Sequence, residues 1–262
     1  MLFRSCTFFR VTYNHERSDE LELNKIYNED CLEGMKRIPD GSVDMILCDL
    51  PYGTTACKWD TIIPFEPLWE QYERVIKDNG AIVLTASQPF TSALVMSNPD
   101  IFRYEWIWEK EQGVNFLLAK KQPMKVHENI LVFSRKQTTY KPQMTYGKPY
   151  VSGKGDSGEV TGRVVKKQTK NNGTRYPRSV QRINRETGIH PTQKPVALFE
   201  YLIKTYTNEG ETVLDNCMGS GTTAIACLNT NRNFIGFELD KGYFDIANER
   251  INKCKRDMVK DN

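Results

Sequence analysis

The stretch MILCDLPYGTT at residues 45–55 decides the organisation of the chain, because an apolar run there ends abruptly in Asp, Pro, Tyr and Gly. Such a run predicts a buried strand, and the residues after it are typical of a turn. A second stretch far downstream, VLDNCMGSGTT at residues 213–223, repeats the layout of apolar run, Asp and glycine-rich turn. In an open parallel sheet, ligands bind beyond the carboxyl ends of the strands, so both strand ends are candidate parts of a site.

Short apolar runs alternate with amphipathic stretches along most of the chain, which is typical of the α/β class with a doubly wound, mostly parallel sheet. The predicted strands are residues 25–28, 43–49, 81–86, 104–108, 129–134, 212–215 and 233–238. One predicted helix carries Leu68, Tyr72, Val75 and Ile76 and stops at the Asn79-Gly80 pair, a good C-terminal cap. Two more helices are predicted from residues 196–206 after Pro195 and from an apolar stripe in residues 244–251.

Acidic residues stand at the ends of four predicted strands, namely Asp30, Asp49, Asp215 and Glu238. The spacing Gly219-x-Gly221-x-x-Ala, with Glu238 at the end of the next strand, is the layout of a nucleotide site. Glycines let the backbone approach the ligand, and the acid accepts hydrogen bonds from ribose hydroxyls. A tight strand-to-helix turn without a ligand would show the same spacing, and the motif alone leaves that alternative open.

The positive charge of the chain is concentrated in residues 136–189. This segment holds twelve Lys and Arg against three acids, a net of +9, whereas the whole chain carries +3. Its tyrosines and glycines and its lack of an apolar period suit contact with a polyanion, because cations neutralise phosphates and tyrosines stack on bases. A solvated loop is the alternative interpretation.

Length and composition limit the number of domains, the cellular compartment and the metal sites that can be expected. A chain of 262 residues is expected to form one large domain with an insertion. The seven cysteines form no C-x-x-C pair, and neither signal peptide nor membrane span is expected, so a cytoplasmic protein is predicted. The three histidines lack the spacing of a zinc site, and no metal is expected.

Four motifs together carry a family resemblance: DLPYG at residues 49–53, HPTQKP at 190–195, DNCMGSGTT at 215–223 and FIGFELD at 234–240. In this order they resemble the β-group of S-adenosylmethionine-dependent DNA amino-methyltransferases, over about residues 25–255. The resemblance implies a seven-stranded methyltransferase sheet with circularly permuted motif order. It divides the chain into an N-terminal arm or tail (1–23), a catalytic half (24–135), a basic DNA target-recognition insertion (136–189) and a cofactor-binding half (190–262).

The resemblance implies that the first motif holds the target base. The amino group of adenine is a poor nucleophile, and two acceptors that hold its hydrogens favour the tetrahedral nitrogen of the transition state. These acceptors are expected to be the Asp49 carboxylate and the Leu50 carbonyl. Pro51 would stiffen the turn, and Tyr52 would stack on a base extruded from the duplex.

The other motifs imply S-adenosylmethionine as cofactor and double-stranded DNA as partner. The expected cofactor-binding residues are Asp30, Cys31, Thr192, Lys194, Asp215, Gly219, Ser220, Gly221, Thr222 and Glu238. Within the basic segment, the expected phosphate contacts are Lys166, Lys167 and Lys170. The expected base-edge contacts are Arg175, Arg178, Arg182 and Arg185.

The chain departs from the family pattern at two places. Leu50 stands where a second Pro is common, and Asn216-Cys217 replaces Pro-Phe after the cofactor Asp. Outside the motifs, Asn115 is a candidate for the base pocket, whereas His127, which stands beside Glu128 at the start of an apolar strand, is expected to be a structural residue.

Methylation of the adenine amino group in DNA is the leading hypothesis. The cytosine amino group is the alternative target, although its enzymes tend to carry Ser in place of Asp49. A nicotinamide-dependent oxidoreductase would leave DLPYG without a role, and a non-enzymatic DNA-binding protein would leave both strand-end motifs without one. A homodimer and a cognate restriction enzyme stay open.

Overall fold

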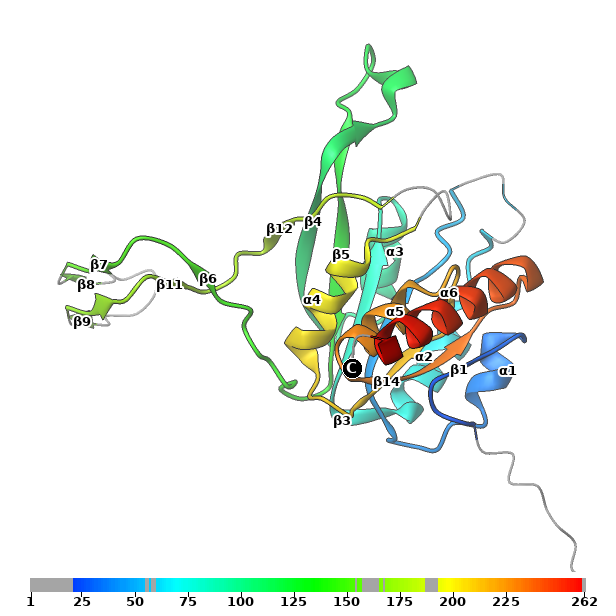
Figure 1. Cartoon of the computed structure of the whole chain (residues 1–262). Helices are drawn as coiled ribbons and strands as arrows, with labels where there is room; N and C mark the ends of the chain where they lie inside the picture. Colours follow the sequence, from blue (N-terminus) through cyan, green and yellow to red (C-terminus); the bar gives the residue numbers. More distant parts are fainter. Residues whose placement is uncertain are drawn as a thin grey trace, which may run out of the picture.

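The computed structural model describes residues 21–54, 57, 60–153, 155–156, 165–166, 168–186 and 193–260, with backbone alone at 155–156 and 165–166. An eight-stranded sheet forms the centre of the molecule (Figure 1). Its first five strands in spatial order are β1 (Lys25–Tyr27), β14 (Asn233–Phe237), β13 (Thr212–Asp215), β2 (Val43–Asp49) and β3 (Ile76–Ala86), all parallel to their neighbours. The predicted α/β class with a mostly parallel sheet is confirmed.

Three further strands complete the sheet. β5 (Lys125–Phe133) lies antiparallel between β3 and β4 (Phe102–Val114), and β12 (Val180–Arg182) pairs parallel with the outer edge of β4. β12 was not predicted from the sequence, and it lies in the segment interpreted as the basic insertion. A three-residue strand with alternating exposure gives little local signal, and its pairing with β4 defines it.

Helices cover both faces of the sheet, because apolar residues alternate along a strand and point to opposite faces. Met45 and Leu47 of β2 pack on the side of α4 (Val196–Tyr206), α5 (Thr222–Asn229) and α6 (Lys241–Lys260). Ile46 and Cys48 pack on the side of α1 (Cys31–Met35), α2 (Phe65–Val75) and α3 (Phe90–Ser97). Burying both faces stabilises the sheet by about 1.5–3 kcal/mol per large apolar side chain.

The predicted end of α2 is wrong. The helix stops at Val75, and Ile76 is already extended, with φ −74° and ψ 139°, and pairs with Val43 of β2. Gly80 is therefore inside β3 and not a helix cap. Its missing Cβ leaves room for the Ile76 side chain, since a Cβ there would lie 2.7 Å from it.

Two long projections leave the sheet (Figure 1). The β4–β5 hairpin carries a 3-10 turn, η1 (Phe116–Leu118), at its tip. Because β5 is antiparallel to β3, this tip extends beyond the carboxyl edge of the parallel strands. No helix among the described residues combines the length and apolar character needed to cross a bilayer.

The second projection is an arm of nested antiparallel pairs. β6 (Thr145–Tyr146) pairs with β11 (Thr174–Arg175), β7 (Tyr150–Val151) with β10 (Lys170–Asn171), and β8 (Gly155–Asp156) with β9 (Val165–Lys166). The arm strands pair with one another and with no strand of the central sheet. The segment is thus an extended ribbon rather than a loop without structure.

Candidate functional site

A cavity of about 780 Å³ opens at the carboxyl edge of the parallel strands. Asp30, Asp49 and Glu238 line it, and Asp215 lines a smaller recess that shares Asp49 with the cavity. The four strand-end acids predicted from the sequence therefore lie around one site. Parallel strands bring their carboxyl ends to the same edge of the sheet, which is why residues far apart in the chain meet here.

The glycine-rich turn after β13 depends on backbone conformations that favour glycine. Gly219 has φ +53° and Gly221 has φ +86°. The Gly219 N–H donates to Glu238 Oε2 at 2.7 Å, and the Asp240 N–H donates to Oε1 at 2.8 Å. Burial raises the pKa of Glu238 despite these donors. The turn is held against the end of β14 with the Glu238 carboxylate on the cavity wall.

Asp215 is buried beneath the same turn. Its Oδ1 accepts from the Cys217 N–H at 3.0 Å, and its Oδ2 accepts from the Thr223 hydroxyl. Burial raises the pKa of Asp215 to about 6. Ser220 and Thr222 line the smaller recess beside it. A buried carboxylate with two donors is suited to hold the cationic part of a ligand.

The opposite wall begins at α1. Asp30 is the N-cap of this helix and accepts from the Leu32 N–H at 2.8 Å, and both Asp30 and Cys31 line the cavity. The Cys31 thiol lies near Asn216 and Cys217, the pair that replaces Pro-Phe. Asn216 Nδ2 donates to both sulfurs at 3.5 Å. Polar and thiol groups thus fill the place of the family's aromatic wall.

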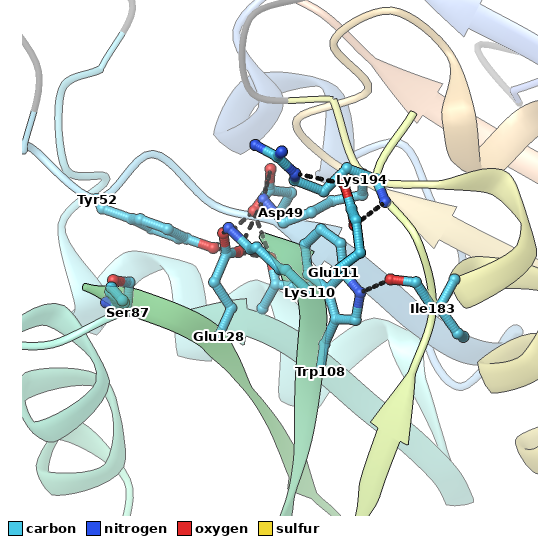
Figure 2. A network of polar contacts seen from close by, with 12 residues as sticks. Asp49, Tyr52, Ser87, Trp108, Lys110, Glu111, Glu128, Ile183 and Lys194 are labelled. Carbon is cyan, nitrogen blue, oxygen red and sulfur yellow. Dashed lines mark hydrogen bonds and ion pairs between the residues drawn. The ribbon is translucent and has the colours of Figure 1, made fainter. Parts of the chain in front are cut away.

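Asp49 ends β2 with both carboxylate oxygens engaged (Figure 2). Oδ1 accepts from the Tyr52 hydroxyl at 2.8 Å and from the Thr85 hydroxyl, and Oδ2 contacts Lys194 Nζ at 2.6 Å. Leu50, Pro51 and Tyr52 also line the cavity. The Tyr52 ring stacks on Phe90 with centroids 5.2 Å apart.

Lys194 lines both the cavity and the smaller recess, and its ammonium is paired with two carboxylates. Its side chain is only 5% exposed, and its Nζ lies between Asp49 and Glu128, 3.3 Å from Glu128 Oε2. Burial opposes its charge, but the two carboxylates outweigh burial and raise the pKa of Lys194. Lys110 forms a further ion pair with Glu128. Sequence reasoning missed Lys110 and Thr85 and gave Glu128 no role in the site, since a single polar or charged residue inside a strand pattern gives no local signal.

Some of the predicted DNA-binding residues have side-chain partners within the protein and others have none among the described residues. The Arg175 guanidinium lies over the Tyr150 ring and donates to backbone carbonyls of the arm, and Arg182 and Arg185 bind Glu109 and Glu111 of β4. Lys170 is exposed in β10, and Arg178 has no side-chain partner among the described residues. Lys166 is described by its backbone alone in β9, whereas Thr192 and Lys167 lie outside the described residues.

The hairpin tip carries Asn115, which sequence reasoning singled out, and further residues that it did not. Asn115 lies there in a left-handed conformation with φ +69°, exposed and away from the cavity, so its assignment to the base pocket is wrong. Phe116 is 76% and Leu117 is 95% exposed. Lys120 and Lys121 follow in the same exposed turn, and no acid lies between residues 115 and 125.

Comparisons with known proteins show the family of the chain. A family model described as DNA methylase (N6_N4_Mtase) matches residues 43–249. The type II methyltransferase M.BglII of Bacillus subtilis is 33% identical over 86% of this chain and 68% of its own length. M1.MboII of Moraxella bovis is 28% identical over 90% of this chain and 99% of its own. The crystal structure of the M1.HpyAVI-SAM complex superposes with a TM-score of 0.59 and 26% identity, covering 86% of this chain and 98% of that one.

Proposed function

Because the chain belongs to the N6/N4 DNA methylase family, we propose that it transfers a methyl group from S-adenosylmethionine to the exocyclic amino group of adenine in DNA. The observation that carries the proposal is the place of Asp49, which ends β2 on the wall of the cavity next to the glycine-rich turn. The cavity then combines a hydrogen-bond acceptor for the target base with a nucleotide site for the methyl donor.

The cavity residues fit the proposed cofactor by their chemistry. Glu238 would accept from the ribose hydroxyls, Asp30 would receive the adenine amino group, and Asp215 would face the ammonium of the methionine end. The sulfonium of this cofactor supplies an activated methyl group, so the protein needs only to position the acceptor and complement the charge that develops on it.

Asp49 has the role of a hydrogen-bond acceptor in this proposal. Its carboxylate and the Leu50 carbonyl would take the two amino hydrogens, which favours the tetrahedral nitrogen that attacks the methyl group. Tyr52 adds an aromatic surface close to this acceptor, and its hydroxyl is fixed on Asp49. The carboxylate, in place of the hydroxyl expected for a cytosine enzyme, favours adenine.

The two projections support DNA as the substrate. Residues 136–189, which include the arm, carry the concentrated positive charge, and the hairpin tip adds Lys120 and Lys121 beyond the edge of the sheet where the cavity opens. Positive groups flanking the site would hold the phosphates of a duplex while the target base is extruded.

The test is to incubate the purified chain with unmethylated DNA and S-adenosylmethionine and to analyse the nucleosides by mass spectrometry. N6-methyladenine is expected. If N4-methylcytosine alone forms, the base assignment is wrong. If no methylated nucleoside forms, the proposed activity is wrong.

A further inference from the structure

The acceptor sites of Asp49 are nearly filled by the protein itself. A carboxylate oxygen offers about two acceptor positions. Oδ1 already accepts from the hydroxyls of Tyr52 and Thr85. An incoming amino group therefore has to use Oδ2, the oxygen that Lys194 contacts at 2.6 Å.

An ammonium on Oδ2 opposes the proposed chemistry. It weakens this oxygen as an acceptor for a second donor. It also places a positive charge beside the nitrogen that becomes positive as the methyl group is transferred, and like charges repel each other. Methyl transfer would be faster if the Lys194 ammonium moved away from Asp49 and stayed paired with another carboxylate.

Glu128 is placed to receive this ammonium. Its Oε2 lies 3.3 Å from Lys194 Nζ and, apart from this ion pair, has no hydrogen-bond donor among the described residues. A charge-assisted hydrogen bond is about 2.7–2.9 Å long, so a shift of roughly half an ångström would complete it. Lys110 pairs with the other oxygen, Oε1, and keeps Glu128 fixed in β5 (Figure 2).

Resting on the proposed function, we infer that Glu128 is a positioning residue that takes the Lys194 ammonium from Asp49 when the target amino group arrives. Asp49 then faces the base as an unshared carboxylate. Lys194 stays paired throughout, because it moves between two carboxylates that it already contacts. No bond is made or broken in this step apart from the hydrogen bonds of the ammonium.

The test uses Glu128→Gln, which keeps the side-chain volume and removes the charge that holds Lys194. The single-turnover rate of methyl transfer to PCR-amplified bacterial genomic DNA, with radiolabelled S-adenosylmethionine, is expected to fall at least 30-fold. The Kd values for S-adenosylmethionine and for the same DNA are expected to stay within about 3-fold of wild type. Glu128→Asp, which keeps the charge on a shorter side chain, is expected to recover part of the rate. Glu105→Gln is the matched control on β4, because its oxygen accepts from Asn129 at 2.8 Å and an amide preserves that bond.

Glu128→Gln removes the partner of Lys194 and also leaves Lys110 without its ion pair. A second variant shows which of these two effects slows methyl transfer. Lys110→Met with Glu128→Gln leaves neither member of that pair charged, and it serves as the test even if Glu128→Gln alone does not fold. We expect the double variant to stay slow. A double variant within 3-fold of the wild-type rate, or a Glu128→Gln protein that transfers normally or loses cofactor affinity instead, would overturn the inference. A wild-type chain that transfers no methyl group would overturn the proposed function, and this inference with it.

Discussion

Asp49 and Glu238 face different parts of the cavity, so their variants should fail in different ways. Asp49→Ala should keep its affinity for S-adenosylmethionine in a calorimetric titration and lose transfer by at least about 100-fold, as expected for a group that acts on the reacting nitrogen. Glu238→Ala should weaken cofactor binding by roughly 10-fold or more, because the cofactor then lacks two hydrogen bonds to a charged group. Equal loss of cofactor binding in both variants would contradict this division of roles.

The buried Asp215 carboxylate should lower the free energy of unfolding at neutral pH, and it also provides a binding group for the cofactor. Its folded-state pKa of about 6 lies above the ordinary value of 3.8, so the folded protein binds a proton more readily than the unfolded chain does. The contribution of Asp215 to the stability of the wild type therefore falls as the pH rises from about 4 to 6 and stays lower above that range.

The variant Asp215→Asn keeps the shape and removes this penalty. At pH 7, without cofactor, its free energy of unfolding should exceed that of the wild type by about 1–3 kcal/mol, and the difference should disappear near pH 4. Urea unfolding at several pH values measures it. A variant that is less stable than the wild type at pH 7 would show that the Thr223 and Cys217 bonds to the carboxylate outweigh its burial.

At the scale of elements, the hairpin and the arm make separable predictions. If Lys120 and Lys121 bind phosphates, changing both to Ala should lower the slope of log affinity against log salt by roughly 0.9 for each phosphate that is no longer neutralised. Salt titrations with duplex DNA measure the slope. Lys253 and Lys255, exposed on α6, are the matched control pair, and their change to Ala should leave the slope as it is.

The arm has its own test in the same titrations. Replacing Lys166, Lys167 and Lys170 by Ala should weaken binding to all DNA sequences and flatten the salt dependence by the same rule. Of the four arginines predicted to read bases, Arg178 is the one that no described side chain or carbonyl holds, so Arg178→Ala should relax selectivity most. An unchanged slope and unchanged selectivity would make the arm a solvated ribbon without a role in DNA binding.

At the scale of the whole molecule, we expect that the arm can be deleted without loss of the fold or of cofactor binding. Its strands pair in nested order, and Thr145 and Arg175 are direct partners at its base, so a short Gly-Ser linker can replace residues 145–175. The shortened chain should keep its circular dichroism spectrum and its affinity for S-adenosylmethionine, because the described residues of the arm add no strand to the sheet and none to the cavity wall. Its affinity for DNA should fall by about 10-fold or more, because the cations that neutralise several phosphates are removed with the arm. Loss of cofactor binding would contradict the independence of the arm.

Local patterns located seven of the eight sheet strands and the four acids at strand ends, although β3, β4 and β5 begin before their predicted bounds and β4 ends six residues later than predicted. Apolar runs and turn residues depend on neighbours in the chain, so β2, β13 and the glycine-rich turn could be located from the sequence alone. The same reasoning failed at the end of α2, where pairing between Ile76 and Val43 overrides the capping signal of Asn79-Gly80. It also failed at β12, which exists only through its pairing with β4.

The ion pairs of the site were decided by the tertiary structure. Lys194 and Asp49 are 145 residues apart, and nothing near either one indicates the other. Glu128 reaches them because β5 runs antiparallel to β3 and brings its first residues to the edge where β2 ends. A buried charge is stable only beside its partners, and partners that come from different strands are set by the order and direction of those strands in the sheet. The sequence by itself therefore determined the strand-end acids and the glycine-rich turn of the site, and the fold determined which charged and polar residues pair with them.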